Sequence, residues 1–121
     1  MRSLLVANLK VSFEAAAAER QDVLQTAVIG WHDNDEDRWP ATAYKKVWPI
    51  EPWSTAASKL DLDYNAGFGG ADCHAAVVWG KKFVYFVHEY DGATKVYAVP
   101  RNPIPCIPYW SNTLVPDATT P

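Results

Sequence analysis

The stretch from His74 to Val99 constrains the fold of this chain more than any other part of the sequence. It holds three runs of β-branched and aromatic residues, separated by Gly-Lys-Lys at 80–82 and by Asp-Gly at 91–92. Runs of this kind, bounded by turn-forming residues, are typical of antiparallel strands joined by hairpins. We therefore predict an antiparallel β-meander in this region.

The length of the first turn decides which side chains face each other across the first hairpin. A three-residue loop of 80–82 would place His74 opposite His88. A two-residue loop of 80–81 would instead place His74 opposite Val87, because one residue of slip changes every partner. Both registers stay open on the sequence, and the histidine pair exists only in the first of them.

The second turn predicts a sheet that is apolar on both faces. An Asp-Gly pair favours a two-residue hairpin turn, which places Phe86 opposite Tyr97 on one face and Tyr85 opposite Ala98 on the other. An antiparallel sheet with one face in water alternates apolar and polar residues instead. We expect a helix to cover one face, and a Trp-rich segment, the C-terminal arm or a second subunit to cover the other. A homodimer is therefore one of the open alternatives.

The N-terminal part of the chain has the pattern of a helix that would pack on this sheet. Ser12 is a suitable N-cap, and four consecutive alanines with high helix propensity follow shortly after it. Apolar residues between 23 and 28 repeat at the spacing of one helical face, and Gly30 stands where a helix would stop. We predict a first strand over residues 3–13 and then a helix from about Phe13 to Ile29.

Residues 31–54 differ abruptly in composition from the segments around them. They contain acidic residues, three prolines and four of the six tryptophans, with no sustained periodicity. Long segments without regular structure are uncommon in compact domains and are often functional. Tryptophans can anchor an interface, and carboxylates can steer association, although the tryptophans could alternatively close a small irregular core. We predict a partner-binding surface made of Trp31, Asp33, Asp35, Glu36, Asp37, Trp39, Trp48 and Trp53.

Prolines limit the structure of the C-terminal part of the chain. Those at 100, 103, 105 and 108 exclude a helix and a central strand, so we expect an extended arm that packs along the domain as far as Trp110. A short helix is predicted over Ser54 to Leu60. The whole chain is predicted to form one compact α+β domain over residues 1–116 and a frayed tail over 117–121. In this domain an antiparallel meander of three or four strands packs against one N-terminal helix.

Charge and cysteine content argue against several classes of function. The formal net charge of -3 and the pI of about 5.5 disfavour a nucleic-acid target, because such binding depends on clustered Lys and Arg. The two cysteines form no C-x-x-C motif, which excludes a disulfide-dense secreted scaffold. The N-terminus lacks a signal-peptide core, and no apolar run reaches the roughly 18 residues that a membrane-spanning helix needs. We therefore expect a soluble cytoplasmic protein without a membrane partner.

His74 and His88 are the sharpest candidates for catalysis or metal binding. Two imidazoles across a hairpin can bind zinc, or one can act as a base whose tautomer a carboxylate fixes. In an extended strand, however, Cys73 and His74 would point to opposite faces, so the sequence does not supply a complete ligand set. We predict no cofactor and a non-enzymatic protein. A small metal-binding protein or enzyme centred on His74 and His88 is the alternative.

Residues 63–105 contain three characteristic segments. These are Asp-Tyr-Asn-Ala-Gly-Phe-Gly-Gly at 63–70, Glu-Tyr-Asp-Gly at 89–92, and a proline-rich close from Val99 to Pro105. They resemble small uncharacterised proteins of phages and mobile elements, which carry a similar Gly-Tyr-Gly stretch, a Glu-Tyr-Asp-Gly turn and a proline close. Those proteins tend to continue with Ser-Glu-Trp-Trp, where this chain has Ala-Thr-Lys-Val at 93–96. The resemblance implies a small accessory protein, in a class that includes inhibitors of host defence systems such as anti-CRISPR proteins, and it assigns no functional residue.

These patterns together predict a small acidic protein-binding inhibitor or modulator. The Trp-rich segment would supply the binding surface, and the partner implied by the resemblance is a host defence complex. The protein would act in the host cytoplasm by occluding a surface of that complex.

Overall fold

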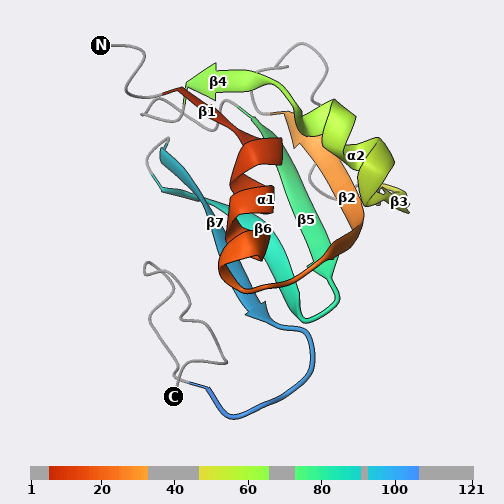
Figure 1. Cartoon of the computed structure of the whole chain (residues 1–121). Helices are drawn as coiled ribbons and strands as arrows, with labels where there is room; N and C mark the ends of the chain where they lie inside the picture. Colours follow the sequence, from red (N-terminus) through yellow and green to blue (C-terminus); the bar gives the residue numbers. More distant parts are fainter. Residues whose placement is uncertain (1–5, 33–46, 66–72, 91–92, 107–121) are drawn as a thin grey trace.

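The computed structural model describes residues 6–32, 47–65, 73–90 and 93–106. Along the chain these residues form β1 (Val6–Asn8), α1 (Leu9–Glu19), β2 (Leu24–His32), β3 (Ile50–Pro52), α2 (Trp53–Leu60), β4 (Asp63–Asn65), β5 (His74–Gly80), β6 (Phe83–Tyr90) and β7 (Ala93–Pro100) (Figure 1). The described residues thus combine two helices with seven strands in antiparallel sheets. The fold is α+β, as predicted, and the short helix predicted before Leu60 is confirmed as α2.

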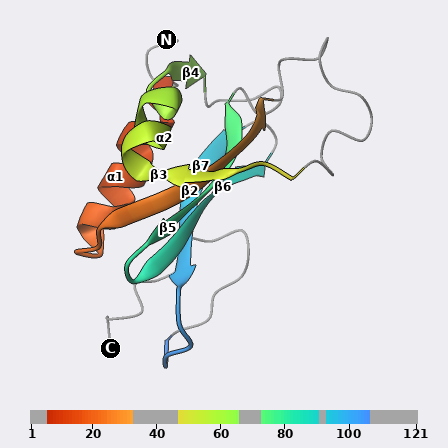
Figure 2. The same ribbon diagram turned by 90° about the vertical axis from the view of Figure 1, so that its right-hand side faces the viewer.

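The strands form one large sheet and one small sheet. The large sheet has the strand order β3-β2-β5-β6-β7, and the small sheet pairs β1 with β4. Figure 2 shows that α1 and α2 lie on the same face of the large sheet. The meander of β5, β6 and β7 confirms the predicted hairpins. The sheet is wider than the predicted three or four strands because β2 and β3 extend it beyond β5.

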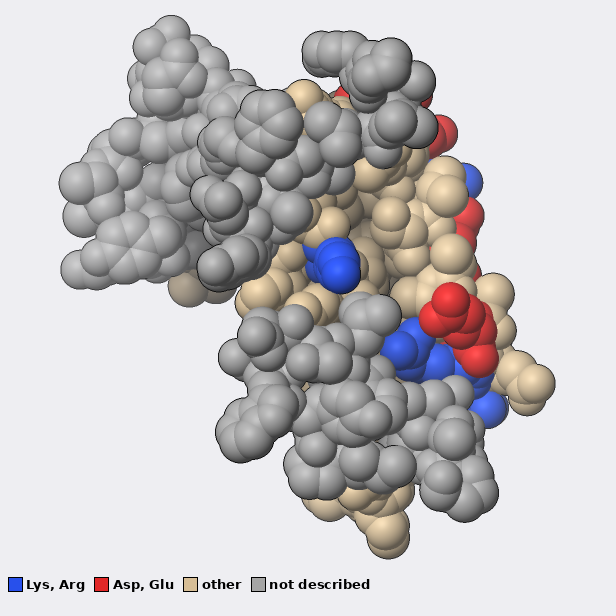
Figure 3. Space-filling view, turned by 90° about the vertical axis from the view of Figure 1, so that its left-hand side faces the viewer, with Lys and Arg blue, Asp and Glu red and all other residues tan. Residues whose placement is uncertain are grey.

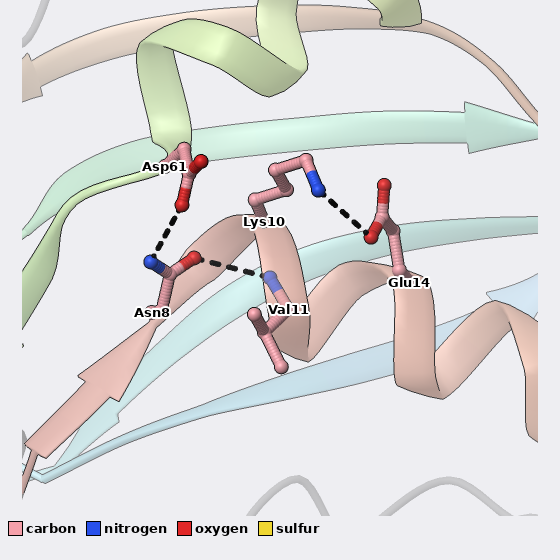
Figure 4. Close-up of polar contacts among 5 residues, drawn as sticks. All are labelled: Asn8, Lys10, Val11, Glu14 and Asp61. Atoms are coloured by element: carbon pink, nitrogen blue, oxygen red, sulfur yellow. Dashed lines mark hydrogen bonds and ion pairs between the residues drawn. The ribbon is translucent and has the colours of Figure 1, made fainter.

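Asn8, not the predicted Ser12, caps the first helix. Its Oδ1 atom accepts a hydrogen bond from the backbone N–H of Val11 at 3.1 Å, which satisfies a donor that a helix N-terminus otherwise leaves without a partner (Figure 4). Its Nδ2 atom donates to Asp61 at 2.9 Å and to Asp63 at 3.0 Å. One side chain therefore both starts α1 and ties it to the segment that joins α2 to β4.

The predicted strand over residues 3–13 is too long, because α1 already begins at Leu9, directly after β1. The predicted helix from Phe13 to Ile29 therefore starts too late, and it is wrong beyond Glu19, where α1 ends. Gln21 has a φ of 52°, in the left-handed region, and β2 begins three residues later. Gly30 lies inside β2, so it is not a helix stop. The apolar residues between 23 and 28 fit the spacing of a helix, but this stretch pairs with β5 and β3, and the pairing outweighs local spacing.

The hydrophobic core lies between the helices and the large sheet. Its largest fully buried side chains are Phe13 from α1 and Val78, Phe83 and Tyr85 from the sheet. Trp53 at the start of α2 packs edge-on against Phe13, with ring centroids 6.1 Å apart. Burying an apolar side chain of this size stabilises the fold by roughly 1.5–3 kcal/mol. This cluster therefore holds both helices on one face of the sheet.

The turn between β5 and β6 consists of the two lysines at 81–82. Val77 pairs with Phe86, which differs from the partners that either predicted loop would give. Both predicted registers of this hairpin are therefore wrong, and so is the predicted pairing of His74 with His88. The second hairpin has the predicted register along its whole length.

Asp22 stabilises the turn between β5 and β6, although it precedes Lys82 by 60 residues in the sequence. Its carboxylate accepts hydrogen bonds from the backbone N–H groups of Lys82 at 2.8 Å and Phe83 at 3.0 Å, and from the Tyr85 hydroxyl at 2.8 Å. A Cβ atom on Gly80 would collide with this carboxylate, so the close approach requires glycine. The two-residue turn therefore depends on a distant side chain.

The hydrogen bonds also set the pKa of Asp22. Burial alone would raise this pKa, but the bond from the Tyr85 hydroxyl and those from the backbone N–H groups of Lys82, Val23 and Phe83 outweigh burial. The net effect is a pKa below the ordinary aspartate value of 3.8. Asp22 is therefore ionised in the folded protein at neutral pH.

The C-terminal arm is described as far as residue 106. Residues 101–106 are exposed and form neither helix nor strand, and the Arg101 side chain donates hydrogen bonds to Gln25 at 3.0 Å and to the Gly80 carbonyl at 2.9 Å. The predicted packing up to Trp110 and the predicted frayed tail lie outside the described residues. Across the ranges that the structure describes, neither helix is long and apolar enough to cross a membrane.

Candidate partner-binding surface

The large sheet has a second face, which points away from both helices (Figure 2). Because side chains alternate along a strand, the neighbours of the buried core residues lie on this second face. Strand pairing brings them together, since Val28 opposes Val77, Val77 opposes Phe86, and Phe86 opposes Tyr97. We call this surface the outer face. Its described residues include Thr26, Val28, Ile50, Pro52, Ala75, Val77, Trp79, Val84, Phe86, His88, Lys95, Tyr97 and Val99.

Three rings form a row across β6 and β7 on the outer face. Phe86 and Tyr97 lie with ring centroids 6.0 Å apart and planes inclined by 53°. His88 stacks on Tyr97 at 4.6 Å with an interplanar angle of 16°. Such pairs contribute about 0.5–1.5 kcal/mol beyond their buried area. The row is therefore preformed and closely packed, with Tyr97 only 5% exposed and Phe86 and His88 half-buried.

The rest of the outer face is apolar and partly exposed. Trp79 and Val84 are half-buried, while the exposed fraction of the side chain is 38% for Val99 and 62% for Ile50. Trp48 extends the surface next to β2, because a Cβ atom placed on Gly30 would lie 3.9 Å from the Trp48 indole nitrogen. Apolar groups thus continue from the β7 edge to the β3 edge of the sheet.

Charge on the outer face is confined to one end. Among its described residues, Lys95 alone carries a formal charge, and it lies opposite His88 near the turn between β6 and β7. Figure 3 shows the molecule from the β7 edge, where blue and red atoms lie next to each other along one margin of the view. An apolar centre with polar groups at its margin is the usual composition of a protein interface.

The structure separates the two described tryptophans of the predicted binding set. Trp48 lies at the outer face, whereas Trp53 packs against Phe13 on the helix side. Trp53 therefore belongs to the core, which agrees with the alternative that the tryptophans close a small core. Five members of the predicted set lie outside the described residues: Asp33, Asp35, Glu36, Asp37 and Trp39. Trp31 lies in β2, and its side chain is likewise outside the description.

The two candidate histidines lie on opposite faces of the sheet. His88 stacks on Tyr97 on the outer face, whereas His74 lies on the helix side and its Nδ1 atom is 3.0 Å from the Gly30 carbonyl oxygen. One metal ion or one catalytic centre cannot use both. Across the described part of the chain, no group of three or more His, Cys, Asp or Glu side chains is placed to hold a metal ion.

His74 does line a hollow of about 140 Å³ on the helix side. Cys73 lines the same hollow, although alternation along an extended strand would have put it on the other face. The reason is that Cys73 lies in a bend before β5 begins. The remaining lining residues are Leu9, Lys59, Leu60, Leu62, Asp63 and Tyr64.

Sequence reasoning missed that the outer face forms one aromatic surface. The signal was present, because the Asp-Gly turn already placed Phe86 opposite Tyr97. The contribution of Trp48 could not have been found, since it depends on how β3 returns to the edge of β2. Comparisons with protein-family models, with curated proteins and with solved structures found no match for this chain. The surface is therefore interpreted from its own geometry.

Proposed function

We propose that this chain is a non-enzymatic protein-binding domain that acts by occupying a surface of a larger complex. The observation that carries the proposal is the outer face, a continuous apolar and aromatic surface opposite the helices. Aromatic anchors supply most of the binding energy in many protein interfaces. Partly exposed groups such as Trp79 and Ile50 would gain contacts when a partner covers them.

The class of partner comes from the resemblance of residues 63–105 to phage and mobile-element proteins. Within that class, an inhibitor of a host defence complex needs no chemistry of its own, because blocking a surface is sufficient. The acidic residues between 33 and 37 would steer the protein toward a basic surface of such a complex. The sequence also predicted the Trp-rich segment, the C-terminal arm or a second copy of the chain as the cover of one sheet face, and each of these stays a prediction.

The test compares a pair of exposed apolar residues on the outer face with a pair of exposed apolar residues on the helix side of the sheet. The outer-face variant carries Ile50→Asp and Val99→Asp, whose side chains are 62% and 38% exposed. The matched control carries Val11→Asp and Leu62→Asp on the helix side, at 58% and 62% exposed. Exposed substitutions of this kind change the free energy of unfolding by about 0.5 kcal/mol or less each, and circular dichroism checks that both variants are folded.

The readout is the number of phage plaques on a host with an active CRISPR defence that expresses each variant. The chain and its control variant are expected to restore plaque formation, and the outer-face variant is expected to fail. Its affinity for the purified defence complex should fall about 100-fold, because two interface positions are lost. Equal activity of the two variants would remove the outer face from the proposal, and no effect of the unmodified chain would overturn the proposed partner.

A further inference from the structure

Strand β7 lies at one edge of the large sheet, and within the described residues it pairs with β6 alone. The backbone N–H of Arg101 donates to the Lys82 carbonyl at 2.8 Å, which continues the β6-β7 register by one pair. Alternate residues of an antiparallel strand bond to the same neighbour, so the backbone groups of Lys95 point to β6, whereas those of Thr94 and Val96 point away from it. The edge therefore presents backbone donors and acceptors at these last two residues.

A groove of about 370 Å³ runs along this part of the edge, between β7 and α1. Figure 1 shows that α1 and β7 run in the same direction. Thr94 and Val96 are partly exposed, whereas Ala98, which has the same backbone orientation, is only 1% exposed and does not line the groove. The lining residues include Ser12, Ala15 and Ala16 of α1 and Thr94, Lys95 and Val96 of β7. An extended segment that adds to such an edge gains affinity from main-chain hydrogen bonds and specificity from the side chains beside them.

The two sides of an added strand would meet different surroundings. Side chains alternate across a strand, so one set would face α1, where the small side chains of Ala15 and Ala16 leave room for apolar groups. The other set would lie beside Lys95, which is exposed and forms no ion pair with the described residues. The charge of Glu19, which also lines the groove, is compensated by Arg20 at 3.6 Å. An acidic side chain beside Lys95 would therefore complete the charge balance of the groove.

The same lysine disfavours a second copy of the chain as the occupant. Antiparallel pairing of two copies about the centre of residues 94–96 would place Lys95 of one copy directly opposite Lys95 of the other. Like charges that directly oppose each other destabilise a sheet. The edge therefore fits a different, acidic strand better than it fits itself.

We propose that the β7 edge binds an extended partner peptide in which acidic and apolar residues alternate. The peptide adds a strand beside residues 94–96, with its apolar side chains toward α1 and its acidic side chains toward Lys95. The site lies at the edge of the sheet and not on the outer face. The proposal does not depend on the proposed function.

The first test measures binding of a short fluorescein-labelled Glu-Val repeat peptide by fluorescence anisotropy, with a Lys-Val repeat of the same length for comparison. The unmodified chain should bind the Glu-Val peptide more tightly. Lys95→Glu should weaken that binding by about fivefold or more and strengthen binding of the Lys-Val peptide, because an attraction becomes a repulsion. The matched control is Lys81→Glu, which makes the same change of charge at an exposed lysine in the turn between β5 and β6. This control should bind as the unmodified chain does.

The second test needs no substitution, because it follows amide hydrogen exchange by NMR. The Glu-Val peptide should slow exchange of the Thr94 and Val96 amides, and it should change the Lys95 amide less, since that amide already bonds to β6. Absence of Glu-Val binding by the unmodified chain, equal affinity of Lys95→Glu and Lys81→Glu, or unchanged exchange at both amides would overturn the proposal. Slower exchange of the same amides at high protein concentration without peptide would assign the edge to a second copy and would also overturn it.

Discussion

Replacing Asp22 with alanine is expected to reduce the free energy of unfolding by about 3 kcal/mol. Four hydrogen bonds end on this carboxylate. They come from the backbone N–H groups of Val23 at 2.9 Å, Lys82 at 2.8 Å and Phe83 at 3.0 Å, and from the Tyr85 hydroxyl at 2.8 Å. All four are lost together when the carboxylate is removed.

Only two of these bonds determine the size of the effect. The N–H groups of Val23 and Lys82 are near the surface and can bond to water after the substitution. Phe83 and Tyr85 are 1% and 0% exposed, so their donors lose the carboxylate where water has little access to replace it. The loss of a hydrogen bond by a buried donor costs about 1–3 kcal/mol, so the two losses together cost roughly 2–6 kcal/mol.

The assay is urea unfolding at neutral pH. The slope of the free energy of unfolding against urea concentration should be the same for the unmodified protein and the variant. Glu14→Ala is the control, because Glu14 forms an exposed ion pair with Lys10 at 3.3 Å and should contribute about 0.5 kcal/mol or less. If Asp22→Ala changed stability no more than this control does, the carboxylate would not hold the turn.

The low pKa of Asp22 adds a dependence on pH to the same prediction. Because the folded-state pKa lies below 3.8, the contribution of Asp22 is complete above that value and is lost as the pH falls through the folded-state pKa. In Asp22→Asn the group no longer titrates. The stability difference between the unmodified protein and Asp22→Asn should therefore shrink as the pH falls below 3.8, and a constant difference would contradict the assigned shift.

Three further substitutions test particular contacts. Gly80→Ala forces a methyl group against the carboxylate of Asp22, and thermal unfolding should show a loss of about 2 kcal/mol; no loss would mean that the turn can move. Asn8→Ala removes the cap of α1 and should cost about 1–2 kcal/mol in urea unfolding, whereas Asn8→Ser should recover the part due to the cap. Trp53→Ala leaves a cavity beside Phe13 and should cost about 3 kcal/mol in the same assay. Trp53→Ala should leave partner affinity unchanged, and a loss of affinity in the folded variant would return Trp53 to the binding surface.

The parts of the fold that could be predicted are those set by neighbouring residues. The strands around the Asp-Gly turn and their register follow from the turn itself, which is why Phe86 was placed correctly opposite Tyr97. The first hairpin could not be predicted in the same way. Its turn is held by Asp22, which is distant in sequence, and no local pattern reveals that contact.

The same limit explains the error at the N-terminal helix. Residues 24–29 have a spacing that suits a helix or a strand, and only pairing with β5 decides between them. The candidate surface was affected similarly, because Trp48 and Trp53 lie close in sequence but belong to opposite faces of the sheet.

Site-specific photo-crosslinking in host cells tests the proposed role of the outer face most directly. A benzophenone amino acid replaces Ile50 on the outer face in one protein and Val11 on the helix side in another. The two residues have similar exposed fractions, 62% and 58%. The account predicts crosslinks from position 50 to a subunit of the host defence complex and none from position 11. Crosslinks to that complex from position 11 alone, or none from either position in a host where the chain blocks defence, would contradict it.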